Sequence, residues 1–146
     1  MGDEDLERDL AERVRRSAFH SWVGLELVHA APGEVEIALD AADHHLNLQG
    51  SVHGGMIATL ADTATGLAVR SMVPEGRRHV TIQLDVHYLA PGRPGRITAV
   101  GRTVRVGTQI AYAEADITDE RGRLLARATS TVAVMADRGE GRTQGR

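Results

Sequence analysis

Apolar residues near the start of the chain follow a helical spacing. Leu6, Leu10 and Val14 recur every four residues among charged neighbours, and Phe19 lies beyond them. Such spacing is typical of a surface helix with one narrow apolar stripe. We therefore assign an N-terminal helix to residues 1–20 and expect it to pack on the edge of the fold.

A longer apolar segment covers residues 53–73. It contains no proline, it is rich in Ala, Leu and Met, and Pro74 with Gly76 follows it as a stop signal. A helix of this length would span about 30 Å, the width of a small domain. Its apolar residues lie nearly all round, so we expect a central helix that is buried on most sides: Met56, Ile57, Leu60, Ala61, Ala64, Leu67, Ala68 and Val69.

Six further segments are predicted to be strands, and alternation of apolar and polar residues is clear in several of them. They are separated by segments rich in Gly, Pro and Asp that can reverse the chain. The first two should form a hairpin, and the last four should form an antiparallel meander that follows the long helix: 25–29, 34–39, 79–89, 96–106, 109–118 and 124–135.

This order of elements predicts an α+β fold in which one antiparallel sheet wraps around the apolar helix. At 146 residues the chain is the size of one domain. We expect this domain to cover residues 21–135. Residues 136–146 are polar and lack periodicity, which predicts a disordered tail.

Composition and charge narrow the function classes. The chain has no cysteine and no lysine, which excludes disulfides, thiolate nucleophiles, Cys-ligated metals and lysine Schiff bases. A net charge of -3 argues against nucleic-acid binding. The start does not resemble a signal sequence, and no apolar stretch approaches the roughly 20 residues of a membrane span. We therefore expect a cytoplasmic protein without a membrane partner.

Residues 47–55, NLQGSVHGG, lead into the long helix and carry candidate chemistry. The first turn of a helix has about four backbone N–H groups without internal partners, at the positive end of the helix dipole. Gly54 and Gly55 would leave these groups open, and the Gly54 N–H could stabilise an oxyanion on a bound carbonyl. Alternatively, the glycines form only a tight turn. His53 could bond the carbonyl, or it could hold the loop through its ring nitrogens.

Asp62 is the second candidate, because it lies in a helix whose other residues are mostly apolar. It could act as a base or nucleophile, or it could bond locally to Thr59, Thr63 or a neighbouring strand. Asp62 follows His53 by nine residues, which places it half a turn round and about 13 Å along a helix. One subunit cannot bring both to the same carbonyl, so a shared role would require a two-fold dimer with two equivalent sites.

These motifs resemble a known family. Asn47, Gly50, His53-Gly54-Gly55 and Leu60-Ala61-Asp62, with Tyr88-Leu89-Ala90-Pro91-Gly92, are similar to the signature of hotdog-fold thioesterases of the phenylacetate-degradation (PaaI-like) type. The similarity runs from about Gly24 to Met135. It implies the hotdog fold, a long helix wrapped by an antiparallel sheet. It also implies hydrolysis of an acyl-CoA or aryl-CoA thioester, with neither a metal nor another cofactor.

The resemblance further implies roles for individual residues. Asp62 would be the catalytic base or nucleophile, Gly54 the oxyanion donor, and His53 and Asn47 groups that shape or polarise the thioester site. Thr81 would orient the attacking water. Arginines in turns are candidates for binding coenzyme A phosphates, because guanidinium groups form bidentate bonds to phosphate oxygens, although each could instead be a solvated surface residue: Arg77, Arg78, Arg93 and Arg96.

Several alternatives stay open at this point. The chain could be a non-catalytic acyl-CoA-binding module on the same fold, or a dehydratase acting on hydroxyacyl or enoyl thioesters. His44, His45 and His53 suggest a metal site, although no histidine or carboxylate repeats at a helical ligand spacing. We expect a homodimer. The sequence leaves open whether dimers pair into a tetramer and which acyl group is the substrate.

Overall fold

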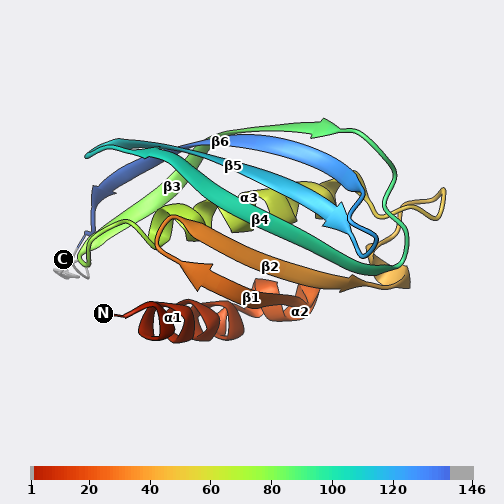
Figure 1. Ribbon diagram of the computed structural model, residues 1–146, viewed down its shortest axis with the longest axis horizontal. Coiled ribbons are helices and arrows are strands. Elements are labelled where there is room, and N and C mark those ends of the chain that lie inside the picture. Colours follow the sequence, from red (N-terminus) through yellow and green to blue (C-terminus); the bar gives the residue numbers. More distant parts are fainter. Residues whose placement is uncertain (1, 139–146) are drawn as a thin grey trace, which may run out of the picture.

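The computed structural model describes residues 2–138, in which a six-stranded antiparallel sheet curves around a long helix (Figure 1). Two helices come first, α1 (Asp3–Arg16) and α2 (Ala18–Val23). The long helix α3 (Gly54–Arg70) follows the first two strands. This architecture confirms the predicted α+β class. The strands are β1 (Leu25–Ala31), β2 (Glu34–Ala41), β3 (Arg77–Tyr88), β4 (Gly95–Val106), β5 (Ile110–Asp119) and β6 (Leu124–Ala136).

The N-terminal region forms two helices that meet at Ser17. Ser17 has extended backbone angles, and its Oγ accepts a hydrogen bond from the N–H of His20 at 3.2 Å, so it caps α2. Leu10 and Val14 are buried, and α1 packs along β1 at one edge of the sheet (Figure 1). The apolar stripe of α1 therefore packs against β1, the strand at this edge of the sheet.

The strand order is β1-β2-β4-β5-β6-β3, so β3 lies at an edge and pairs with β6. The predicted four-strand meander is therefore wrong in one respect: β4, β5 and β6 form a meander, but β3 does not pair with β4. After β3 the backbone N–H groups of Leu89 and Ala90 donate to the carbonyl of Leu125 at 2.8 and 3.1 Å, which keeps the chain along β6. Pro91 and Pro94 then lack the N–H groups of a tight hairpin. The open side of β4 pairs with β2 instead.

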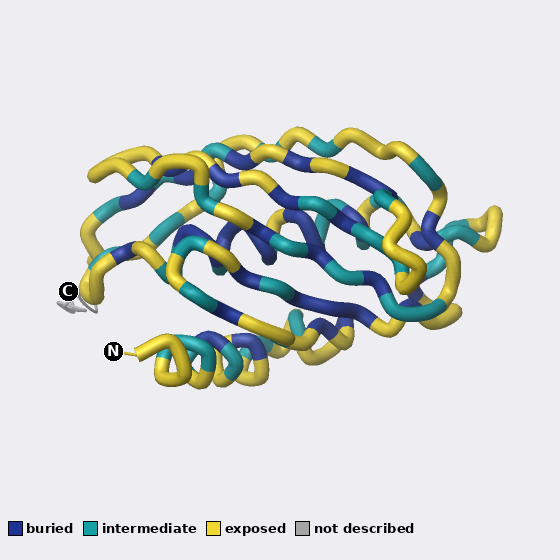
Figure 2. Tube along the Cα trace, in the orientation of Figure 1, coloured by how far each residue is buried: buried dark blue, intermediate teal, exposed yellow. Residues whose placement is uncertain are grey.

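The core lies between α3 and the inner face of the sheet, where buried residues follow the inward positions of the strands (Figure 2). Gly101 of β4 lets the helix come close, because a Cβ there would lie 2.3 Å from the carbonyl oxygen of Ala64. Most of α3 is buried or partly buried, which agrees with the predicted central helix, and Gly55 and Asp62 are its exposed residues.

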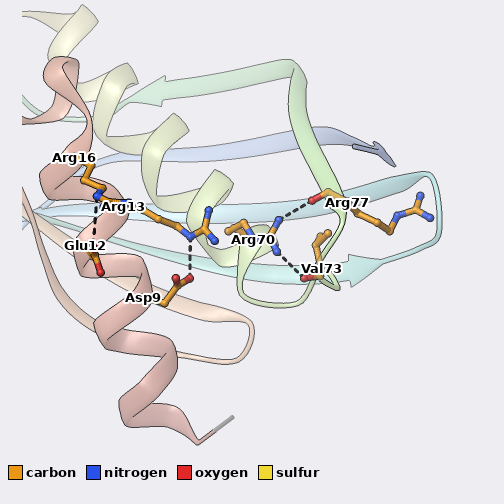
Figure 3. A network of polar contacts seen from close by, with 7 residues as sticks. All are labelled: Asp9, Glu12, Arg13, Arg16, Arg70, Val73 and Arg77. Carbon is orange, nitrogen blue, oxygen red and sulfur yellow. Dashed lines mark hydrogen bonds and ion pairs between the residues drawn. The ribbon is translucent and has the colours of Figure 1, made fainter. Parts of the chain in front are cut away.

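Arg70 holds the end of α3 to the start of β3. Its guanidinium donates to the carbonyl oxygen of Arg77 at 2.8 Å and to that of Val73 at 3.0 Å (Figure 3). Beside it lies Arg13 of α1, which is paired with Asp9 at 2.8 Å (Figure 3). These contacts fix the direction in which β3 leaves the helix.

The chain leaves the sheet close to where the predicted tail begins. Ala136 is the last residue of β6, and the N–H of Asp137 donates to the carbonyl of Gly76 at 2.9 Å. The rest of the predicted tail, residues 139–146, lies outside the described residues.

Candidate active site

The first turn of α3 presents one backbone N–H group without an acceptor. His53 is the N-cap residue, and its Nδ1 accepts from the N–H of Gly55 at 2.8 Å. The His53 carbonyl accepts from the N–H groups of Met56 and Ile57 at 2.8 and 3.3 Å. Among the described residues nothing accepts from the N–H of Gly54. This group is therefore available to a ligand oxygen at the positive end of the helix dipole.

The ring of His53 combines the two roles that its sequence position left open. Because Nδ1 accepts a hydrogen bond, the neutral ring carries its proton on Nε2. The ring thus holds the loop through Nδ1 and leaves an Nε2–H donor on an exposed side chain. The backbone N–H of His53 donates to the carbonyl of His45 at 2.8 Å, which anchors the residue from the other side.

Asn47 and Gly54 line the same recess, which has a volume of about 360 Å³. Asn47 Oδ1 accepts from the N–H groups of Gln49 and Ser51 at 2.9 and 3.1 Å, so its side chain closes the loop before α3. Tyr88 forms another wall, and its hydroxyl donates to the carbonyl of Gly54 at 2.7 Å. Tyr88 had no predicted role in the site.

Asp62 lies on the exposed side of α3 and is held by a strand. Its Oδ1 accepts a hydrogen bond from Thr81 Oγ1 at 2.8 Å. Thr59, one of the local partners considered for Asp62, donates to the carbonyl of Gly55 instead. Asp62 and Thr81, two predicted site residues, are therefore in direct contact, and the carboxylate faces away from the core.

The two parts of the site lie along one helix and one strand. β3 runs antiparallel to α3, with Tyr88 against Gly54 and Thr81 against Asp62. Eight residues separate Gly54 from Asp62, which corresponds to about 12 Å along the helix. Within a single chain, the free N–H of Gly54 and the carboxylate of Asp62 are too far apart to act on the same carbonyl group.

A family model described as thioesterase superfamily matches residues 49–126, more than half of the chain. The chain belongs to the thioesterase superfamily. The matched range includes Gly54, Asp62, Thr81 and Tyr88. Membership confirms the resemblance seen in the motifs, and with it the prediction of a thioester hydrolase.

Several individual proteins are similar to this chain over most of their length. The medium/long-chain acyl-CoA thioesterase YigI of Salmonella typhimurium is 30% identical over 136 residues, which cover 83% of this chain and 88% of that protein. The structure of smu.793 from Streptococcus mutans bound to acetyl CoA has a TM-score of 0.72 at 31% identity, covering 80% of this chain and 92% of that one. The E. coli PaaI protein has a TM-score of 0.84 at 21% identity, covering 92% and 96%, and supports the fold alone.

His79 is a second residue that sequence reasoning missed. It precedes Thr81 by two positions on β3, and its Nε2 lies 3.6 Å from the place where a Cβ of Gly66 would be, one helical turn beyond Asp62. Burial lowers the pKa of His79 below its ordinary value of 6.5, and the positive charge of Arg70 lowers it further. The negative charge of Asp62 acts against this shift and raises the pKa of His79, but burial is the larger effect.

The four predicted phosphate-binding arginines fall into two separate recesses. Arg77 and Arg78 lie in one near the start of β3, and Arg93 and Arg96 lie in another beyond its end. A strand of this length separates the two recesses by roughly 35 Å. Arg96 is engaged by Glu26 and Asp40 at 2.6 and 3.3 Å, and Arg77 donates to the carbonyl oxygen of Thr108 at 2.7 Å. Among the described residues, Arg78 and Arg93 form no side-chain hydrogen bond or ion pair.

Two of the three histidines considered for a metal site, His45 and His53, are held by hydrogen bonds within the fold. His45 ends a short 3-10 helix (Asp43–His45), where its Nδ1 accepts from the N–H of Ala42 at 3.0 Å and its Nε2 donates to the carbonyl of Val23 at 2.7 Å. Both nitrogens of this ring are therefore occupied. Residues 2–138 contain no group of three or more His, Asp or Glu residues placed to hold a metal ion. The same residues contain no helix that is both long and apolar enough to cross a membrane.

Proposed function

We propose that this protein hydrolyses an acyl-CoA or aryl-CoA thioester at a site shared by two protomers. Gly54 of one protomer binds the thioester carbonyl oxygen, and Asp62 of its partner acts as base or nucleophile. The observation that carries this proposal is the placement on α3 of one free first-turn N–H and one exposed carboxylate, too far apart to serve one carbonyl in a single chain.

The exposed edge of β3 supports a two-fold dimer. β3 pairs with β6 on one side, and its other edge has no partner within the described residues. Val80 and Ile82, which point away from α3, are 46% and 59% exposed. An unprotected edge strand with apolar residues is a template for pairing with another strand. Two antiparallel β3 strands would form one continuous sheet and place the exposed sides of the two α3 helices face to face.

The register of this dimer follows from the contacts within each chain. Asp62 lies against Thr81, and Gly54 lies against Tyr88. Bringing Asp62 of one protomer to Gly54 of the other therefore places Thr81 opposite the partner's Tyr88. Because residue 82 is the extra residue of the bulge in β3, the positions between these two pair as 83 with 87, 84 with 86 and 85 with itself. The two-fold axis then passes through Asp85, near the middle of β3.

The reaction uses groups that the two protomers supply separately. The N–H of Gly54 and the Nε2–H of His53 donate to the carbonyl oxygen, which gains negative charge when the carbonyl carbon is attacked. In one route Asp62 removes a proton from the attacking water, the C–S bond breaks, and the proton passes to the coenzyme A thiolate as it leaves. In the other route Asp62 attacks the carbon itself, so that the C–S bond breaks and the thiolate leaves as an anhydride forms, and water then hydrolyses the anhydride. Thr81 holds the Asp62 carboxylate throughout.

The same register brings the two free arginines together. Arg78 of one protomer lies opposite residue 91 of its partner, two residues from the partner's Arg93. These side chains would form a cationic site next to the recess that contains Gly54. Guanidinium groups without other partners suit the phosphates of coenzyme A. We therefore assign the phosphates to Arg78 and Arg93, with Arg77 and Arg96 as structural residues.

Thiol release from a panel of acyl-CoA and aryl-CoA esters tests the activity. Asp62→Asn should lower kcat by at least about a hundredfold, because the variant retains the shape of the carboxylate but neither its charge nor its basicity. Asp9→Asn on α1, an exposed aspartate far from the recess, is the matched control and should match the wild type. Comparable turnover by Asp62→Asn and the wild type would refute the assigned role. Tight acyl-CoA binding without thiol release from any ester would indicate a binding module instead.

Mixed dimers test the sharing of sites between protomers. A side chain at residue 54 would begin 3.4 Å from the Tyr88 ring, so Gly54→Val should block the oxyanion site. Unfolding and refolding Asp62→Asn together with Gly54→Val should restore about one quarter of the wild-type activity, because half of the dimers are mixed and each has one intact site. Activity no higher than that of the separate variants would show that each site lies within one chain.

A further inference from the structure

Tyr88 contacts the residue that carries the free N–H group. Its hydroxyl donates to the Gly54 carbonyl at 2.7 Å, and its ring atoms lie 3.4 Å from the place where a Cβ of residue 54 would be. The side chain comes from the last residue of β3, 34 positions along the chain. One tyrosine thus covers the first turn of α3 on the side of the recess.

Gly54 needs such a contact because it has few restraints of its own. It has no side chain, and glycine backbone torsions are softer than those of other residues. Its neighbours Gly55, Met56 and Ile57 are each tied to His53 through their N–H groups, whereas its own N–H is free. The hydroxyl of Tyr88 is the only side-chain group among the described residues that forms a hydrogen bond with Gly54.

The strand that carries Tyr88 is itself held to α3 at two points. β3 is an edge strand with one neighbour in the sheet, so its distance from the helix is weakly restrained by backbone pairing. Thr81 joins it to Asp62, and Tyr88 joins it to Gly54. The first contact orients the carboxylate, and the second fixes the start of the helix where the carbonyl oxygen would bind.

We propose that Tyr88 is a positioning residue for the oxyanion site, which it sets by fixing Gly54 through the hydrogen bond to the Gly54 carbonyl. This inference rests on the proposed function. The hydroxyl acts through Gly54 and does not touch the reacting atoms. Its effect falls on the step in which the carbonyl oxygen gains charge, so it should appear in kcat and leave KM nearly unchanged.

Tyr88→Phe removes the hydroxyl and keeps the ring that fills the space above Gly54. Loss of one hydrogen bond that aligns a donor should lower kcat about two- to tenfold, with KM within about twofold of the wild type. The chain has two tyrosines, and the other, Tyr112 on β5, is half-exposed and forms no side-chain hydrogen bond among the described residues. Tyr112→Phe is therefore a matched control that should leave both constants unchanged.

Binding of two inert coenzyme A derivatives separates positioning from a purely structural role. A ketone analogue, with methylene in place of sulfur, retains the carbonyl oxygen that Gly54 would bind, and a thioether analogue lacks it. The wild type should bind the ketone more tightly, and Tyr88→Phe should lose part of that preference. An unchanged preference with unchanged kcat, or equal weakening of both analogues, would overturn the role of Tyr88. No thiol release by the wild type would instead refute the proposed function itself.

Discussion

Replacing Thr81 by valine isolates the hydrogen bond that holds Asp62. Valine has the same shape as threonine, and its branched side chain suits a strand. The change removes only the Oγ1 donor that lies 2.8 Å from the Asp62 carboxylate. Thr81 is half-buried on an edge strand, so the free energy of unfolding should change by less than about 0.5 kcal/mol. A loss of activity would then be a property of the site.

The structure sets the expected size of this loss. A hydrogen bond to a charged group contributes roughly 1.5–3 kcal/mol, and each 1.36 kcal/mol corresponds to about a tenfold change in rate. Asp62 is exposed in the single chain, where water can replace the lost hydroxyl. We therefore expect the lower end of the range, a decrease of about tenfold in kcat. Thr81→Ser keeps the donor and should stay close to the wild type.

Steady-state thiol release, together with chemical denaturation of each variant, is the assay. If Thr81 acts through Asp62, the double variant Asp62→Asn/Thr81→Val should be no slower than Asp62→Asn alone, because there is no carboxylate left to orient. Wild-type kcat in Thr81→Val would refute the reasoning. So would a further tenfold loss in the double variant, since it would mean that the hydroxyl acts independently of the carboxylate.

Three further outcomes follow from the structure. Gly101→Ala should lower the free energy of unfolding by about 2–3 kcal/mol, because the alanine Cβ would lie 2.3 Å from the carbonyl oxygen of Ala64. A denaturant titration measures this change, and unchanged stability would contradict the close approach of α3 to β4. Burial lowers the pKa of His79 in the folded protein below its ordinary value of 6.5. As the pH falls below about 6.5, His79 therefore binds a proton in the unfolded chain before it does so in the folded protein. The free energy of unfolding then decreases until the pH reaches the lower, folded-state pKa. His79→Gln should flatten this loss in unfolding curves measured between about pH 7.5 and 5, and an unchanged slope would contradict the role of His79. Arg78→Gln should raise KM about fivefold for an acyl-CoA but not for the acyl-pantetheine that lacks the nucleotide phosphates, and an equal rise for both would exclude a phosphate contact.

The local part of the site was accessible from the sequence. A glycine pair after a histidine, followed by a long apolar segment, predicts a helix start with open N–H groups, and α3 begins at Gly54. Asp62 was recognisable because a carboxylate among apolar helical residues needs a partner. The distance between them along a helix follows from helical geometry alone. These features depend on residues close together in the chain, so the pattern of residue types suffices.

The partners of those residues were decided only by the tertiary structure. Thr81 and Tyr88 are seven positions apart, and strict alternation along a strand would place them on opposite faces. A bulge between Thr81 and Gln83 shifts the alternation by one residue, so that both side chains face α3. β3 also lies at the sheet edge, next to β6 and not next to β4. Strand order and bulges depend on contacts between distant segments, which local periodicity does not contain, and these contacts bring Tyr88 to Gly54 and Thr81 to Asp62.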